Sequence, residues 1–386
     1  MQISVIILNY NVRFFLEQCV LSVEKALQSI DGEIIVIDNN SLDDSCEMMK
    51  QRFPHVKLIE NKENSGFPKG NNIGVAQARG EYLCILNPDT VVAEDTFEKV
   101  LAFAKSKTDL GIVGCKLIDG TGRFLPESKR GVPTPFVAFT KVTGLYKLFP
   151  SSKLFGRYYA QHLNENETGK TAILVGAFMI MKRDLYLEVG GFDENCFMYS
   201  DDIDLSYMVL QKGKSNYYFP ETSVIHYKGE STVRDGLYMK RFREAMHFFY
   251  QKHFRVSYFF DVFMSMGAFL FLIFKKNQAV KTTRNIEEYW LFSSDEKQVV
   301  KVENLLGKKV TLADSTLKND LNSPTDESSK NIEIIFDNNV WSFKAIIDFM
   351  ERHQSKRFTF KILPSNSDFI LGSNSSNDRG EVIKLQ

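Results

Sequence analysis

The sequence predicts an α/β protein whose main domain is a mainly parallel sheet with helices on both faces. Through residues 1–115, short apolar runs rich in β-branched residues alternate with helical patterns. This alternation is typical of parallel sheets that are buried on both faces. A second, smaller pattern of the same kind at residues 285–386 predicts a small C-terminal α/β domain.

The expected elements follow from the apolar runs and their spacing. The main domain should have strands at 2–8, 33–38, 56–60, 81–86 and 111–115 and helices near 12–29, 43–52, 69–79 and 93–105. Residues 116–170 show no clear period, so we expect loops and short elements there. After them come a strand, a short helix, a helix that begins near Asp202 and a strand at 215–220. The C-terminal strands should lie at 288–292, 309–314, 332–337, 357–363 and 368–372, with two helices and a polar loop at 321–331.

Three domains are expected, at 1–233, 234–284 and 285–386. The middle one is helical and contains the apolar run Val256–Phe274, which has basic residues on both sides. A membrane span needs about 20 predominantly apolar residues, and Asp261 inside this run would be costly there. We therefore expect an amphipathic or packed helix that can contact anionic lipid at the membrane surface.

Composition limits the classes of function. Lys plus Arg and Asp plus Glu both number 48, so the zero formal net charge gives no support for a nucleic-acid partner. The five cysteines are scattered and form no CxxC pair, which favours a reducing compartment over a zinc or dithiol site. The N-terminal "MQISVIILNYN" lacks a basic region and reads as a first strand. These features predict a cytoplasmic location.

Polar residues directly follow the apolar strands of the main domain. Asn9 and Tyr10 follow the first strand, Asp38 follows the second, and Asn87 and Asp89 follow the fourth. Ligands of such sheets bind at the carboxyl ends of the strands. A strand-end carboxylate can hold Mg²⁺ or Mn²⁺ together with substrate phosphates. The residues alone leave other roles open, namely a β-turn at Asn87–Asp89 and a helix cap at Asp38.

The stretch "ENSGFPKGNN" at residues 63–72 joins a glycine-rich loop to the start of a helix. Glycines allow close backbone approach, and helix N-termini favour phosphate, so this segment is a candidate phosphate site. The alternative is that Gly66, Gly70 and Gly74 only ease packing.

The stretch "SDDID" at residues 200–204 places three carboxylates at the expected helix start. The helix dipole partly explains them. Crowding of like charges also raises a pKa toward the range useful for a general base. Two of the three can equally be structural. His226, in "VIHYKGEST", is a lone histidine, and such residues are more often structural than ligands.

Taken in order, these motifs resemble the family 2 glycosyltransferases of the GT-A fold, with the closest likeness to bacterial rhamnosyltransferase-type members. The resemblance covers about residues 1–275. It implies that domain 1–233 is catalytic and transfers a sugar, with inversion, from a nucleotide diphosphate to an acceptor hydroxyl. It favours dTDP-rhamnose as the donor and a growing polysaccharide or lipid-linked saccharide as the acceptor.

The resemblance also implies roles for individual residues on the donor side. Asp89 matches the metal ligand that ends the family's DXD motif, and His226 matches a position that completes the shell of Mg²⁺ or Mn²⁺. Asn87 departs from the motif's first aspartate, which leaves its contact to ribose or metal in doubt. The other implied donor contacts are Asn9, Tyr10 and Asp38 at the nucleoside and Asn71 beside the phosphates.

On the acceptor side, the pair Asp201 and Asp202 matches the Glu-Asp pair before the acceptor-site helix. The resemblance implies that the second member, Asp202, is the general base. The C-terminal domain at 285–386 carries no phosphate loop or carboxylate cluster. We therefore expect an accessory domain, and donor binding that survives in a chain ending near residue 284.

Two other functions are compatible with parts of this pattern. A sugar-phosphate nucleotidyltransferase also uses a parallel sheet and a metal, but it typically opens with a glycine-rich, basic loop where this chain has "LNYNVRFF". A catalytically silent nucleotide-binding regulator is the other, and the joint presence of Asp89, Asp202 and His226 argues against it. The sequence leaves open whether the chain forms a homo-oligomer.

Overall fold

The structure is a computed structural model of the chain. It describes residues 1–134, 136–137, 140, 145–148, 156–228, 236–254, 285–313, 330–355, 357–374 and 380–384. The apolar run Val256–Phe274 and nearly all of the loop at 321–331 lie outside these ranges, so both expectations stay untested. Within the described ranges, no helix has the length and apolar character that crossing a membrane requires.

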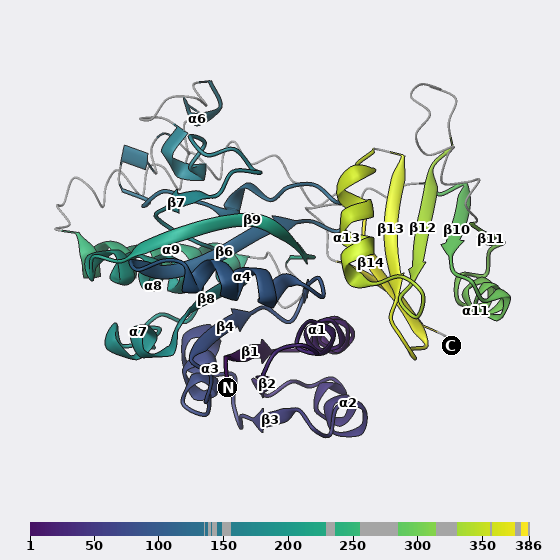
Figure 1. Cartoon of the computed structure of the whole chain (residues 1–386), viewed down its shortest axis with the longest axis horizontal. Coiled ribbons are helices and arrows are strands. Elements are labelled where there is room, and N and C mark those ends of the chain that lie inside the picture. Colours follow the sequence, from purple (N-terminus) through teal and green to yellow (C-terminus); the bar gives the residue numbers. More distant parts are fainter. Residues whose placement is uncertain are drawn as a thin grey trace.

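The main sheet has the strand order β3-β2-β1-β4-β8-β6-β9-β5, with β7 paired to β9 (Figure 1). Six strands run in one direction, whereas β5, β7 and β8 run in the other. The prediction of a mainly parallel sheet is therefore confirmed. The short strands β5 and β7 were not predicted. The strands are β1 Ile3–Asn9, β2 Gly32–Asp38, β3 Lys57–Glu60, β4 Tyr82–Leu86, β5 Thr90–Val91, β6 Leu110–Ile118, β7 Gly169–Thr171, β8 Phe178–Lys182 and β9 Ser215–His226.

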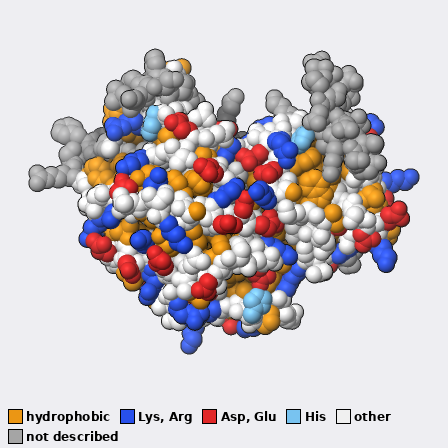
Figure 2. Space-filling model, viewed as in Figure 1, with side chains coloured by type: hydrophobic (Ala, Val, Ile, Leu, Met, Phe, Trp, Pro, Cys, Tyr) orange, Lys and Arg blue, Asp and Glu red, His pale blue; other side chains and the backbone are white. Residues whose placement is uncertain are grey.

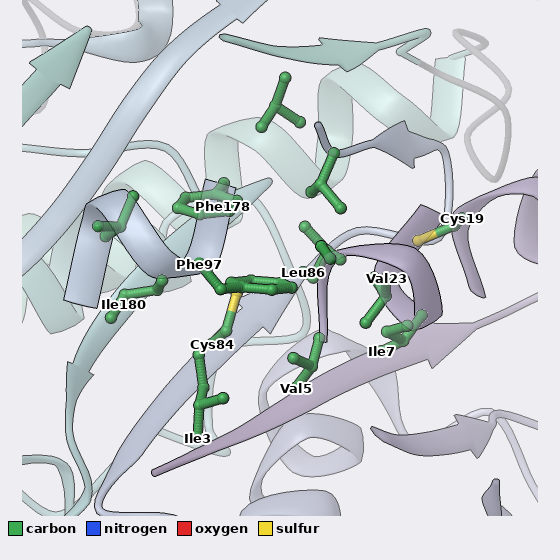
Figure 3. Close-up of a cluster of buried hydrophobic side chains, with 14 of the residues drawn as sticks. Ile3, Val5, Ile7, Cys19, Val23, Cys84, Leu86, Phe97, Phe178 and Ile180 are labelled. Carbon is green, nitrogen blue, oxygen red and sulfur yellow. The ribbon is translucent and has the colours of Figure 1, made fainter. Parts of the chain in front are cut away.

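Helices cover both faces of this sheet, as the continuous apolar strands predict. In β1, Ile3, Val5 and Ile7 pack toward α1, α2 and α4, and Figure 3 shows part of this cluster. Ile6 and Leu8, on the opposite face, belong to the cluster that contains α3, α7 and α8. Successive strand residues point to opposite faces, so one strand supplies both clusters. The helices are α1 Arg13–Ala26, α2 Ser45–Arg52, α3 Gly66–Val75, α4 Thr96–Lys105, α7 Arg183–Glu188 and α8 Asp201–Gln211.

The region at 116–170 contains only short elements where it is described, as expected. These are η1 Pro126–Ser128, α6 Leu145–Leu148, η2 Gly156–Tyr159 and the start of β7. After β9, the helix α9 Gly236–His253 packs against α8 through an aromatic cluster that includes Phe249.

The C-terminal domain is a second sheet with the order β11-β10-β12-β13-β14-β15. Its first four strands are parallel, and β14 and β15 complete it as an antiparallel pair. The helix α11 packs on one face and α13 on the other. The small α/β domain predicted here is confirmed. Its elements are β10 Glu288–Phe292, α11 Glu296–Leu306, β11 Thr311–Leu312, β12 Ile332–Asp337, α13 Phe343–Arg352, β13 Phe358–Leu363, β14 Phe369–Ser373 and β15 Glu381–Lys384.

The two sheets share one hydrophobic cluster, and Figure 1 shows α13 between them. Phe15, Ile118 and Ile225 of the main domain lie in the same cluster as Ile346 and Met350 of α13. A chain that ends near residue 284 would expose this surface to water. Burial of one such side chain is worth about 1.5–3 kcal/mol. The two domains therefore stabilise each other, and donor binding by a truncated chain depends first on whether it stays folded.

Polar contacts fix the position of α13. The backbone N–H groups of Phe343 and Lys344, at the helix N-terminus, donate to the Glu94 carboxylate, each over 2.8 Å. A carboxylate at a helix N-terminus satisfies unpaired donors and complements the helix dipole. Near the other end of α13, Glu351 pairs with Lys116 over 2.9 Å.

Gly122 allows close approach of the domains, and its replacement should weaken their contact. It has a φ of +80°, and a Cβ atom there would lie 2.2 Å from the carbonyl oxygen of Met350 in α13. Gly213 is the matched control, since its φ is +73° but its Cβ would meet nothing within 4 Å. We expect Gly213→Ala to cost about 1–2 kcal/mol of unfolding free energy through backbone strain. Gly122→Ala should cost roughly 1–3 kcal/mol more through the clash. Urea unfolding measures both, and equal losses would show that this contact does not constrain the interface.

The face of the molecule in Figure 2 carries Lys, Arg, Asp and Glu side chains interspersed with one another. This mixture agrees with the zero net charge of the chain. All five cysteines are free, and four of them are buried.

Candidate active site

Asn9 and Asp38 meet at the carboxyl ends of β1 and β2, where the parallel register places them opposite each other. Asn9 Nδ2 donates to Asp38 Oδ1 over 2.8 Å, and the Ser41 N–H donates to Asp38 Oδ2 over 2.8 Å. Both side chains are buried, and Tyr10 beside them is half-buried. At the start of α2 the Ser45 N–H donates to Asp43, whereas Asp38 accepts from Ser41 ahead of the helix. The cap expected in this polar segment therefore falls on Asp43 rather than on Asp38.

Asn39 holds the loop after β3 against this strand end. Its Nδ2 donates to Asn64 Oδ1 and to the Gly66 carbonyl, and its Oδ1 accepts from Asn61 and Ser65. Sequence reasoning missed this role, although the polar run "DNNS" was a signal for it. A cavity of about 240 Å³ opens beside the loop. It is lined by Asn61, Lys62, Glu63, Ser65, Lys69 and Ile73.

The glycines of α3 serve packing, as the alternative interpretation had it. A Cβ atom at Gly70 would lie 2.4 Å from the Leu8 side chain, and one at Gly74 would lie 2.4 Å from that of Ile37. Asn71 is buried, and its Nδ2 donates to the Phe67 carbonyl over 2.9 Å. Its Oδ1 has no hydrogen-bond partner among the described residues. A phosphate contact of Asn71 stays a prediction.

Asn87, Asp89 and His226 come together from distant parts of the chain. The short strand β5 pairs with β9, so Thr90 lies opposite His226. His226 Nε2 lies 3.4 Å from Asp89 Oδ1 and 3.4 Å from Asn87 Nδ2. The β-turn interpretation holds as well, because Thr90 Oγ1 donates to the Asn87 carbonyl over 2.7 Å. The turn and the antiparallel β5–β9 pair together build this site.

The chemistry of these side chains fits a hard divalent cation that arrives with its substrate. Asp89 offers a carboxylate oxygen, and His226 offers an imidazole nitrogen. In the described part of the chain, no group of three or more His, Cys, Asp or Glu side chains is placed to hold a metal. Mg²⁺ typically takes one or two carboxylates plus phosphates and waters, so two protein ligands suffice when a diphosphate supplies others.

Asp204 is the structural member of the "SDDID" carboxylates. It is buried and accepts from two residues of α9, from Lys252 Nζ over 2.8 Å and from His253 Nε2 over 2.5 Å. Breaking a buried ion pair of this kind typically costs about 3–5 kcal/mol. Asp204 therefore fixes α9 to α8 and leaves Asp201 and Asp202 as the candidates for chemistry.

Asp201 and Asp202 lie in different surroundings although they are adjacent. Asp202 Oδ2 accepts from Arg130 Nη2 over 2.5 Å and from the Gly176 N–H over 3.1 Å. Asp201 is buried, and burial together with the charge of Asp202 raises its pKa from 3.8 to about 7. The pKa increase expected from crowding thus falls on Asp201. Arg130 was missed, because it lies in the aperiodic region at 116–170.

The segment before β8 joins the two groups of candidate residues. The Gly176 N–H donates to Asp202, and the carbonyl of the next residue, Ala177, accepts from the Asn87 N–H over 3.1 Å. A Cβ atom at Gly176 would lie 3.4 Å from Asp202 Cβ and 3.6 Å from Asp201 Oδ2. The carboxylate pair and the strand end with Asn87 and Asp89 therefore contact two consecutive residues of the chain.

A strand-end carboxylate and a second carboxylate pair, joined by contacts to Gly176 and Ala177, make this part of the α/β domain a candidate active site. Residues 4–190 match the model of the family described as "Glycosyl transferase family 2". The matched residues are just under half of the chain, and this part is similar to a domain of that family.

Two curated relatives have names that specify glycosyl transfer, and each aligns with about half of this chain. An N-acetylglucosaminyl-diphospho-decaprenol L-rhamnosyltransferase of Mycobacterium tuberculosis is 27% identical over 213 residues, which are 52% of this chain and 68% of that protein. The rhamnosyltransferase WbbL of Escherichia coli K12 is 26% identical over 221 residues, which are 53% of this chain and 78% of that protein.

Among solved structures, a mannosyltransferase of Pyrobaculum calidifontis in complex with GDP-Man and Mn²⁺ aligns with a TM-score of 0.46 and 18% identity. The alignment covers 70% of this chain and 69% of that one. The similarity to the family rests on the sequence matches alone.

Proposed function

We propose that this chain is an inverting, metal-dependent glycosyltransferase that transfers a sugar from a nucleotide diphosphate to a saccharide or lipid-linked saccharide in cell-surface polysaccharide synthesis. Transfer of L-rhamnose from dTDP-rhamnose is the first candidate, because the names of two relatives specify rhamnosyl transfer. A lipid-linked acceptor implies contact with a membrane surface, at the cytoplasmic face in this proposal.

One observation carries the proposal. In a family 2 domain, Asp89 and His226 form a pair with a carboxylate oxygen and an imidazole nitrogen 3.4 Å apart. Asp202 accepts from the Gly176 N–H, and the carbonyl of the next residue, Ala177, accepts from the N–H of Asn87 beside this pair. A diphosphate bound at the first position would thus lie close to a base at the second. A glycoside hydrolase instead needs two carboxylates flanking the scissile bond.

The donor side holds the nucleotide in this proposal. The Asp38 carboxylate, fixed by Asn9 and Ser41, would accept a hydrogen bond from the imide N–H of a pyrimidine base. Asp89 and His226 would hold Mg²⁺ or Mn²⁺ against the diphosphate. A bound cation supplies electrostatic stabilisation of the charge that develops on the leaving diphosphate.

The acceptor side needs only a proton acceptor. Asp202 would take the proton of the acceptor hydroxyl while that oxygen attacks the anomeric carbon from the face opposite the leaving group. One attack from that face inverts the configuration. The raised pKa of Asp201 favours its protonated form, which carries no second negative charge next to the base.

Screening of nucleotide sugars by thermal denaturation in the presence of Mn²⁺ tests the proposed function. A ligand that binds only the folded state raises its stability by an amount that grows with concentration, about 2.7 kcal/mol at 100 times Kd. We expect dTDP-rhamnose to raise the unfolding temperature more with Mn²⁺ than with EDTA. We also expect slow hydrolysis of the donor in the absence of acceptor. A protein that neither binds nor hydrolyses any nucleotide sugar would contradict the proposal.

A further inference from the structure

Arg130 is a buried cation that contacts the proposed base from outside the family motifs. Its Nη2 donates to Asp202 Oδ2 over 2.5 Å and to the Leu174 carbonyl over 3.4 Å. Its backbone is fixed too, because Arg130 and Ile173 each donate an N–H to the carbonyl of the other, over 2.9 and 2.8 Å. The guanidinium is thereby held at a defined place relative to α8.

The two carboxylate oxygens of Asp202 have different partners. Oδ2 accepts two hydrogen bonds, from Arg130 Nη2 and from the Gly176 N–H. No donor to Oδ1 is found among the residues that the structure describes. A carboxylate anchored through one oxygen keeps the lone pairs of the other available for a hydroxyl proton. Arg130 also has a buried Nε–H without a partner in the described part of the chain.

We propose that Arg130 is a positioning residue that holds Asp202 by Oδ2, so that Oδ1 faces the hydroxyl of the acceptor. This inference rests on the proposed function, and it names the residue that orients the base of that reaction. The bond to Asp202 also supplies a positive charge beside a carboxylate that has to be ionised to accept a proton. A group placed about 1 Å away from its working geometry loses on the order of 10²-fold in rate.

Other titratable groups around the pair are consistent with this role. Asp201 comes from α8 itself, Tyr158 from η2 and Glu127 from η1, and all lie near the Arg130–Asp202 pair. Burial alone would lower the pKa of Arg130, but several opposing contributions, of which the charge of Asp202 is the largest, together outweigh burial, so the pKa is raised. Arg130 therefore stays charged in its buried place.

The experiment compares Arg130→Met and Arg130→Lys with the wild type in the full-length chain. Transfer or donor hydrolysis is followed from pH 5 to 9 with Mn²⁺ and saturating donor. Arg130→Met should lower kcat by about 10²-fold while the affinity for dTDP with Mn²⁺ is unchanged. The acidic limb of its pH–rate profile should move to higher pH, because a cation beside a carboxylate favours the ionised form. Arg130→Lys keeps the charge and should restore part of the rate and the position of that limb.

Lys129→Met is the matched control for loss of a buried cation from the same segment. Lys129 Nζ donates to the carbonyls of Ala160 and Leu163 and makes no contact with Asp202. The Lys129→Met variant should keep the wild-type pH–rate profile. Equal rate losses and equal pH profiles for Lys129→Met and Arg130→Met would overturn the inference, as would an unchanged kcat in a folded Arg130→Met protein. A wild type that turns over no nucleotide sugar would overturn the proposed function and this inference together.

Discussion

The Asp202→Asn enzyme should transfer sugar about 10²- to 10⁴-fold more slowly than the wild type at saturating donor, because general base catalysis contributes a factor of this size. The amide keeps the size of the side chain but cannot take the proton of the acceptor hydroxyl. Donor affinity should survive, since the proposed nucleotide and metal contacts are made by other residues, at the ends of β1, β2 and β9 and in the turn after β4. Calorimetry with dTDP and Mn²⁺ and a transfer assay on the same protein measure the two quantities.

Asp201→Asn is the control for loss of the neighbouring carboxylate, and we expect a smaller loss of rate. It also has its own effect on stability. Since the pKa of Asp201 is raised from 3.8 to about 7, the folded protein binds this proton more tightly than the unfolded chain does. Wild-type stability therefore falls as the pH rises from about 4 to about 7. Asn removes this dependence, so the stability of the variant relative to the wild type should increase over that range and then stay constant. A greater loss of rate in Asp201→Asn than in Asp202→Asn would assign the base to Asp201.

The Asp89→Asn protein should lose metal-dependent binding of the donor, with a decrease in affinity on the order of 10²-fold or more, because even residues that only support a metal ligand contribute 10- to 100-fold. A neutral amide is a poorer ligand for a hard cation than a carboxylate. Calorimetry with dTDP should give similar affinities for the variant with Mn²⁺ and for the wild type with EDTA.

Asp95→Asn is the matched control for the loss of Asp89. Asp95 lies beyond β5, at the start of α4, and its carboxylate pairs with Lys99 and Lys344. Its replacement should leave the effect of Mn²⁺ on donor affinity intact. A normal Mn²⁺ effect in Asp89→Asn would remove Asp89 from the metal site.

The secondary structure could be predicted where an apolar run is long enough to show the hydrophobic pattern of a strand or helix. All five strands expected in residues 1–115 are present, because four are runs of buried apolar residues and the edge strand β3 has two half-buried apolar residues that pack on opposite faces of the sheet. The strands β5 and β7 have two and three residues, which is too short for a pattern. The contact between the two domains was missed, because complementarity between distant surfaces leaves no local signal in the sequence.

Individual residues of the candidate site could be predicted from the sequence, but the contacts between them could not. The ordered motifs named Asp89 and His226, and the structure brings them together through a two-residue strand. The contact of Arg130 with Asp202 could not be predicted, because it joins an aperiodic loop to a helix 72 residues away. The roles of Asn9, Tyr10, Asp38, Asn71, Asn87, Asp89, Asp201, Asp202 and His226 toward substrate or metal stay predictions.

The hydrophobic cluster shared by the two sheets has a consequence for synthesis of the protein. Phe15, Ile118 and Ile225 are made early, whereas the helix α13 that covers them emerges much later. At roughly 5–20 residues per second, the ribosome needs on the order of 10 s to make the chain from β9 to α13. During that interval the nascent enzyme presents an uncovered apolar surface, which is the kind of surface that chaperones bind and that promotes aggregation. The last hundred residues of the chain thus complete the folding of the first two hundred.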